Sequence, residues 1–187
     1  MLKNEKGQAV APKTVTMTKK DFEDQGNTRV YWLGGGGAMI NDHGTVIMID
    51  PLLEGFDMTL LIEMPIDVKD VPHVDAILVS HVDNDHYSRP TCRDLKDVCK
   101  EYHTSYYVAS LMKEECGLDG IGHDIGDHIQ INDIDVELNG QCDKPVPDFI
   151  RILRQPANGL RFADIVEPRH KRSVEIFGKK NEIALIA

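Results

Sequence analysis

Two histidines and two aspartates lie close together in this chain, as His81, Asp83, Asp85 and His86. An apolar stretch, residues 76–80, comes directly before them. Imidazole nitrogen and carboxylate oxygen are ligands of borderline and hard divalent metal ions. The pattern therefore predicts a metal site in a loop after a buried strand, where open α/β sheets usually place their chemistry.

The spacing of these four residues suits a site with two metal positions. Positions 81, 83 and 85 alternate, so they can converge from a tight loop, and residue 86 can turn in beside them. Such a site lowers the pKa of a bound water from about 15.7 toward 7 and holds the oxygens of a carbonyl or phosphoryl group. The alternative is a polar surface turn, because Asp and Asn are common in turns.

A β-meander is expected upstream of this loop. Its strands are residues 29–33, 38–40 and 45–50, and its turns are the glycine run 34–37 and residues 41–44. The last strand brings a carboxylate, Asp50, to its C-terminal end. The glycine run lacks the features of a P-loop or a dinucleotide fingerprint, so it is interpreted as a flexible turn.

Further elements are expected after the loop. They are a helix over residues 90–102, a strand over 105–109, a short helix from Ser110 to Gly117, and a hairpin of residues 128–131 and 134–138. The first helix would carry Cys92 and Cys99 on one face. His123 and His128 flank a turn and are interpreted as surface residues of the hairpin rather than a ligand pair. This order predicts an α/β arrangement with a mixed sheet.

The composition of the chain limits the classes of function that we expect. The chain has 187 residues, which suits one domain, and a net charge of −10, which argues against binding to phosphate backbones or anionic membranes. The basic stretch 168–172 is interpreted as a solvated surface segment. The four cysteines include no Cys-x-x-Cys pair. No signal peptide or membrane-spanning run is evident, so the cytoplasm is the expected location.

The sequence resembles the metallo-β-lactamase fold superfamily, whose motif is His-x-His-x-Asp-His after a strand. Residues 81–86 read His-x-Asp-x-Asp-His, and residues 31–34 with 47–51 resemble the first hairpin of that fold. The Trp-Leu-Gly segment and the Ser-His-x-x-x-Asp-His run are most similar to the lactonase-like branch, which includes ascorbate-6-phosphate lactonase. The resemblance covers residues 28–138.

The resemblance implies an αβ/βα sandwich with a dinuclear site, commonly zinc, with manganese or iron in some branches. By position, His81 and residue 83 would bind one metal, and Asp85 and His86 the other. Asp85 would also orient the attacking water as the catalytic residue, and Asp50 would support the loop.

Two departures from the family pattern stand out. Asp83 occupies a position where the family usually has histidine; it either ligates, favouring harder metals such as manganese, or no longer ligates. The family's later ligands, a histidine after residue 138 and a Gly-Asp-Thr type carboxylate, are not visible; His170 lies in the basic stretch and is interpreted as a surface residue. The chain thus reads as a polar arm (residues 1–27), a core resembling the N-terminal half of the sandwich (28–138) and a divergent segment (139–187).

The leading hypothesis is a metal-dependent hydrolase that acts on a lactone, ester or phosphoester. It would use up to two zinc or manganese ions and a small-molecule substrate, with no nucleic-acid or membrane partner. The alternative is a metal-deficient, non-catalytic remnant of the same fold that acts through binding or association. A second copy of the chain is a further candidate for completing the site.

Overall fold

The computed structural model describes residues 3–8, 11, 13–58, 60–139, 149–154 and 184–186. Within these residues, ten strands form two sheets. They are β1 (Thr28–Gly34), β2 (Gly37–Asp42), β3 (Thr45–Ile49), β4 (Val74–Leu78), β5 (Cys99–Ser105), β6 (Gly120–His123), β7 (His128–Ile131), β8 (Ile134–Asn139), β9 (Phe149–Arg154) and β10 (Ala184–Ile186). The helices are α1 (Arg89–Asp94) and α2 (Tyr106–Leu111), with short 3-10 turns at Lys19–Phe22 and Val68–Asp70 and a π-helical turn at Met112–Cys116.

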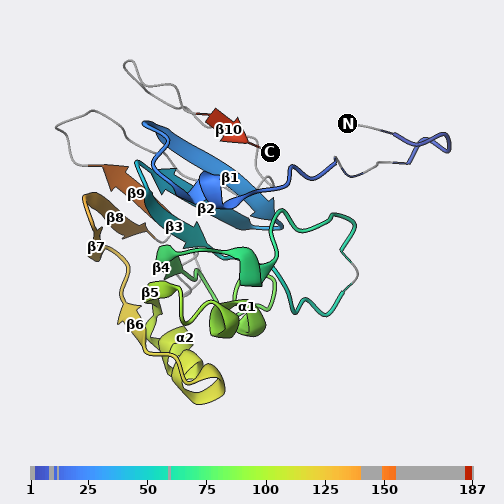
Figure 1. The fold of residues 1–187 in the computed structure, drawn as a ribbon. Coiled ribbons are helices and arrows are strands. Elements are labelled where there is room, and N and C mark those ends of the chain that lie inside the picture. Colours follow the sequence, from blue (N-terminus) through green and yellow to red (C-terminus); the bar gives the residue numbers. More distant parts are fainter. Residues whose placement is uncertain are drawn as a thin grey trace.

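The larger sheet is mixed, as the sequence predicts. Its seven strands run in the order β10-β1-β2-β3-β4-β5-β6. The expected meander is confirmed, because β1, β2 and β3 pair antiparallel. The strands from β3 to β6 then pair in parallel, as does β10 with β1 at the opposite edge (Figure 1). Parallel strands end at one edge of a sheet, so this topology brings the residues after β3, β4 and β5 together.

A second sheet of three antiparallel strands, β7-β8-β9, packs on one face of the first. The hairpin predicted for residues 128–138 is confirmed as β7 and β8. Alternate residues of β3 separate into two cores: Ile47 and Ile49 contact the second sheet, and Val46 and Met48 face the helices. A strand covered on both faces reads as a continuous apolar run, which explains its sequence.

All helical turns of the described residues contribute to the core on the other face of the larger sheet. This arrangement is a helix layer, a sheet and a second sheet. The fourth layer of an αβ/βα sandwich is not found within the described residues, so the coarse α/β prediction is confirmed and the full sandwich is not. Phe22, within the expected polar arm, is completely buried in the helix-side core. Within the segment interpreted as divergent, residues 139–187, the structure describes the strands β9 and β10.

The helix predicted over residues 90–102 is wrong beyond Asp94. Ser88 is the N-cap of α1 and Pro90 lies in its first turn, but residues 99–105 form β5, so Cys92 and Cys99 do not share a helix face. Cys92 and Tyr102 reach the same core from different elements, and the Tyr102 hydroxyl donates a hydrogen bond of 2.7 Å to the Cys92 carbonyl. The spacing of Cys92 and Tyr102 in the sequence therefore resembles that of apolar residues on one face of a helix, although the two residues belong to different elements.

The strand predicted over residues 105–109 is also wrong beyond Ser105, the last residue of β5. Ser105 caps α2 by accepting a hydrogen bond from the Val108 N–H, so residues 106–109 are helical. Ser110 does not start a helix; its hydroxyl donates back to the Tyr107 carbonyl. The predicted end at Gly117 is confirmed, since Gly117 adopts the left-handed φ of 68° that ends helices. No helix of the described residues is long and apolar enough to cross a membrane.

Candidate metal centre

The predicted ligand loop lies at the edge of the sheet where the parallel strands end. Residues 79–88 connect β4 to α1, and Asp50 follows the neighbouring strand β3. The Asp50 N–H donates to the Leu78 carbonyl at 2.9 Å, and the Ser80 N–H donates to Asp50 Oδ1 at 2.7 Å. These two bonds continue the strand pairing past the ends of β3 and β4. They fix the point from which the loop departs.

Asp50 is the buried acceptor at the base of this loop. Besides the Ser80 N–H, its carboxylate accepts the Ser80 hydroxyl at 2.6 Å and lies 2.8 Å from Nδ1 of His86. Its backbone has a φ of 44°, in the left-handed region that a side chain other than glycine adopts at an energetic penalty. The three hydrogen bonds of the Asp50 carboxylate offset the energetic penalty of this backbone conformation.

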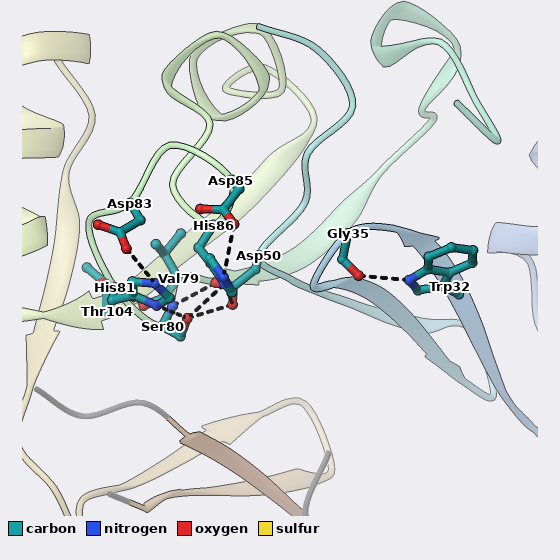
Figure 2. A network of polar contacts seen from close by, with 10 residues as sticks. All are labelled: Trp32, Gly35, Asp50, Val79, Ser80, His81, Asp83, Asp85, His86 and Thr104. Atoms are coloured by element: carbon teal, nitrogen blue, oxygen red, sulfur yellow. Dashed lines mark hydrogen bonds and ion pairs between the residues drawn. The ribbon is translucent and has the colours of Figure 1, made fainter. Parts of the chain in front are cut away.

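Ser80 joins both histidines of the loop to Asp50. Its Oγ lies 2.9 Å from Nδ1 of His81 and 3.5 Å from Nδ1 of His86, and the two rings are 3.9 Å apart between centroids (Figure 2). The Ser80 hydroxyl has one proton, which goes to Asp50. Nδ1 of each histidine is then the protonated nitrogen, donating to Ser80 and Asp50 respectively. This assignment leaves the lone pair of each imidazole on Nε2, the state of a metal ligand.

The Nε2 atoms face the carboxylates of the loop. Nε2 of His81 lies 3.4 Å from Oδ2 of Asp83, and Nε2 of His86 lies 3.7 Å from Oδ2 of Asp85 (Figure 2). The Asp83 side chain is 70% exposed, whereas that of His86 is only 14% exposed. The loop thus presents two imidazole–carboxylate pairs, with the imidazoles anchored from behind and the carboxylates on the solvent side.

These residues fit a divalent ion in their chemistry. Two donors bound to one tetrahedral zinc at about 2.0–2.1 Å are separated by about 3.3 Å, close to the distances within the two pairs. Among the residues that the structure describes, no group of three or more His, Cys, Asp or Glu side chains is placed to hold one ion. His170 and the basic stretch 168–172 lie outside the described residues.

The glycine run 34–37 contributes to the site in a way that the sequence did not indicate. It forms the predicted turn between β1 and β2, and Trp32 Nε1 donates to the Gly35 carbonyl at 3.0 Å (Figure 2). Gly36 packs against the His86 ring so closely that a Cβ there would lie 2.9 Å from Cε1. The one sequence signal for this contact is the glycine run itself, because a glycine lets another group approach the backbone closely.

The other histidines have partners of their own. His123 lies on β6 and its Nε2 is 2.9 Å from Nδ1 of His103, whereas His128 is paired with Asp135 on the neighbouring strand. His128 is an exposed residue of the hairpin, as interpreted, but that interpretation is wrong for His123, which lies on the larger sheet with a side chain only 14% exposed. The contact between His103 and His123 was not predicted.

Comparison with known proteins shows the fold. No protein-family model matches the sequence, and no curated protein matches it. Among solved structures, the chain is similar to CmlA, a diiron beta-hydroxylase from Streptomyces venezuelae, with 13% identity and a TM-score of 0.54 over 76% of this chain and 27% of that one. An isothiocyanate hydrolase from Delia radicum gut bacteria has 15% identity and a TM-score of 0.50 over 67% of this chain and 57% of that one.

A third similar structure is Igni18, a novel metallo hydrolase from the archaeon Ignicoccus hospitalis, with 18% identity and a TM-score of 0.49 over 68% of this chain and 56% of that one. The chain spans between 27% and 57% of the length of these three proteins. At such low identity the similarity concerns the fold, which this chain shares with CmlA and the isothiocyanate hydrolase.

Proposed function

We propose that this chain is a metal-dependent hydrolase of the metallo-β-lactamase superfamily, of the lactonase-like branch, which uses water to open a lactone, ester or phosphoester. The observation that carries the proposal is the orientation of two histidines. Ser80 and Asp50 occupy Nδ1 of His81 and His86, so both Nε2 atoms face carboxylates of the same loop. A surface turn would need no buried serine and aspartate behind its imidazoles.

Each residue of the loop has a role in the proposal. His81 and Asp83 would bind one divalent ion, and Asp85 with His86 would bind a second. A bound ion would supply a water with its pKa lowered toward 7. Asp85, on the solvent side of its pair, would orient that water toward the substrate. Asp50 and Ser80 are positioning residues, because their contacts are with each other, with the imidazoles and with the backbone.

Zinc and manganese are the metals that this donor set favours. Imidazole suits zinc, and the additional carboxylate of Asp83 raises the affinity for harder ions such as manganese. Three carboxylates, of Asp50, Asp83 and Asp85, lie around the two imidazoles, so the local charge attracts a cation.

The first experiment measures bound metal and hydrolysis together. Protein from culture supplemented with zinc and manganese is analysed for metal content and assayed with a lactone, an aryl ester and a phosphodiester. We expect His86→Ala to lower the metal content by at least one equivalent and to abolish hydrolysis. His128→Ala is the matched control, because His128 is exposed and bonded outside the loop.

Equal metal content in the wild type and His86→Ala, together with no hydrolysis by either, would overturn the proposal. That result would favour a non-catalytic protein that acts through association. We further infer that the substrate is a small molecule and that a second copy of the chain completes the site. Specific activity that rises with protein concentration supports this association. Specific activity that does not depend on protein concentration contradicts it.

A further inference from the structure

A small pocket lies beside β1, between the polar arm (residues 1–27) and the segment 51–66 that follows Asp50. The apolar residues of its lining include Val15, Met17, Trp32, Ile62 and Pro65. The charged residues of the lining, Lys13 and Glu63, are both exposed. Sites for small molecules are typically concave and mostly apolar, with few polar groups, and this pocket has that character. We call it the arm pocket.

The polar arm forms one wall of the arm pocket and is bonded to the opposite wall. The Thr14 hydroxyl donates to the Glu63 carbonyl at 2.7 Å, and the Met17 N–H donates to the Pro65 carbonyl at 2.8 Å. Figure 1 shows the arm running past the loop that joins β3 to β4. The two hydrogen bonds hold the walls together, so the pocket is formed before any ligand arrives.

The arm pocket is connected to the candidate metal centre by the turn between β1 and β2. Trp32 Nε1 donates to the Gly35 carbonyl at 3.0 Å (Figure 2). The next residue, Gly36, packs against the His86 ring. From these contacts and the dimensions of the backbone, Trp32 Nε1 and the His86 ring lie within about 10 Å of each other. One small molecule can therefore reach from the pocket to the loop of residues 81–86.

Large apolar side chains stay exposed at this pocket. Val15 and Trp32 are 50% and 42% exposed, and Leu61, the neighbour of Ile62 in the chain, is 87% exposed. An apolar occupant that removes such surface from water gains free energy. Trp32 Nε1 already has its acceptor in the Gly35 carbonyl, so the indole needs no polar partner from a ligand. The pocket therefore favours a hydrocarbon group.

We propose that the arm pocket binds the hydrocarbon chain of the substrate while the reacting carbonyl group lies at the loop of residues 81–86. The substrate is then an ester or lactone that carries an alkyl or acyl chain, rather than a phosphoester. This inference rests on the proposed hydrolase function. In the reaction, water adds to the carbonyl carbon, the bond from that carbon to the alkoxy oxygen breaks, and a carboxylic acid and an alcohol form.

Binding is tested without turnover, with the full chain and the uncharged ligands 1-butanol and 1-octanol. NMR signals of the Val15 and Ile62 methyl groups report on the pocket, as does the indole N–H of Trp32, the single tryptophan of the sequence. We expect saturable shifts of these signals. Affinity should rise about fourfold for each methylene that the pocket buries, so 1-octanol should bind at least about tenfold more tightly than 1-butanol.

Two variants of the lining test the assignment. Val15→Asp places a charge at a half-exposed position, so it should weaken 1-octanol binding by at least about tenfold while the chain stays folded. Ile62→Ala removes apolar surface without adding charge and should weaken binding about fivefold. This second variant keeps the proposal testable if Val15→Asp detaches the arm. Ile125→Asp is the matched control, because Ile125 is 55% exposed and lies outside the pocket.

The absence of saturable shifts with 1-octanol would overturn the proposal, as would equal binding by the wild type and both pocket variants. Sedimentation velocity tests another occupant, a second copy of the chain. A dimer that Val15→Asp dissociates and that 1-octanol leaves intact would assign this surface to self-association, and that result would also overturn the proposal.

Hydrolysis of an aryl acetate and an aryl octanoate links the pocket to the reaction. We expect a lower KM for the octanoate, and Val15→Asp should raise the octanoate KM more than the acetate KM. Ile125→Asp should change neither value. A KM that does not depend on chain length would overturn the assignment of the substrate. Absence of all hydrolysis would overturn the proposed function alone, because alcohol binding is measured without turnover.

Discussion

Gly36 lies directly against the imidazole of His86. A Cβ on residue 36 would stand 2.9 Å from Cε1 of that ring, closer than Cβ atoms approach other atoms, and 3.3 Å from Nδ1. Nδ1 of His86 is at the same time 2.8 Å from the Asp50 carboxylate. The ring is thus held between a glycine backbone and a buried acid, and a displacement on either side would turn its Nε2 away from Asp85.

Gly36→Ala should therefore weaken metal binding. The added methyl group must push the His86 ring or the turn by a few tenths of an ångström, which misaligns the nitrogen that faces Asp85. We expect about a tenfold loss of metal affinity, comparable to the loss of a supporting contact behind a ligand, with little change in thermal stability. Calorimetric titration of zinc or manganese measures it.

The control for this variant is Gly35→Asn in the same turn. Gly35 has a φ of 55°, and no atom lies within 4 Å of the point that a Cβ on this residue would occupy. Asparagine tolerates that backbone region. Unchanged metal affinity in Gly35→Asn with a loss in Gly36→Ala assigns the effect to the His86 contact. Equal losses in both variants would contradict it.

Asp50→Asn should lower metal affinity about 10–100-fold while the chain stays folded. Asparagine is compatible with the left-handed φ of 44° at this position, but it lacks the charge that holds the proton on Nδ1 of His86. The Nδ1 resonances in ¹⁵N NMR of the histidine rings report the tautomer directly. A wild-type tautomer and wild-type affinity in Asp50→Asn would show that the carboxylate does not orient the ring.

Asp83→His tests whether position 83 ligates. The Asp83 carboxylate lies 3.4 Å from Nε2 of His81, so a histidine there would exchange an oxygen donor for a nitrogen donor. We expect zinc affinity to rise and manganese affinity to fall, each by about tenfold, because imidazole favours the softer ion. Unchanged affinities for both metals would mean that residue 83 makes no contact with the ion.

Asp75 should make stability depend on pH in the acid range. Burial opposes its ionisation, but hydrogen bonds from Lys100 Nζ at 2.6 Å and from the Val46 N–H at 2.8 Å outweigh that effect and lower the pKa of Asp75. A lowered pKa in the folded state gives stability that is present above the unfolded value of about 3.9 and is lost as the pH falls through the folded pKa.

We accordingly expect Asp75→Asn to reduce the free energy of unfolding by roughly 1.5–3 kcal/mol at pH 7, the range for hydrogen bonds to a charged group. The difference from the wild type should shrink below about pH 4, where the carboxyl of the unfolded wild type becomes neutral, and should continue to shrink as the pH falls through the lowered pKa of the folded state. Urea unfolding at pH 7, 5 and 3 measures this. A difference that stays constant over the three pH values would exclude Asp75 as the titrating group.

Much of the fold could be predicted from local patterns. The β-meander, the strand before residue 81 and the hairpin of β7 and β8 follow from apolar runs, alternation and turn residues, which act over short distances in the sequence. The helix over residues 90–102 failed for a physical reason. Tyr102 packs in the same core as Cys92 but arrives there on β5, which forms because it pairs in parallel with β4. Strand pairing between segments that are distant in the sequence produces no periodic pattern of apolar residues in either segment.

By itself, the sequence determined the donors of the loop, their spacing and their place after a buried strand, because these are properties of adjacent residues. The tertiary structure alone decided which nitrogen of each histidine faces outward. Asp50 and Ser80 lie 30 residues apart along the chain, and the parallel pairing of β3 and β4 brings them within hydrogen-bonding distance behind His81 and His86. The same holds for His103 and His123, which β5 and β6 bring together. Ring orientation and proton position depend on such long-range contacts.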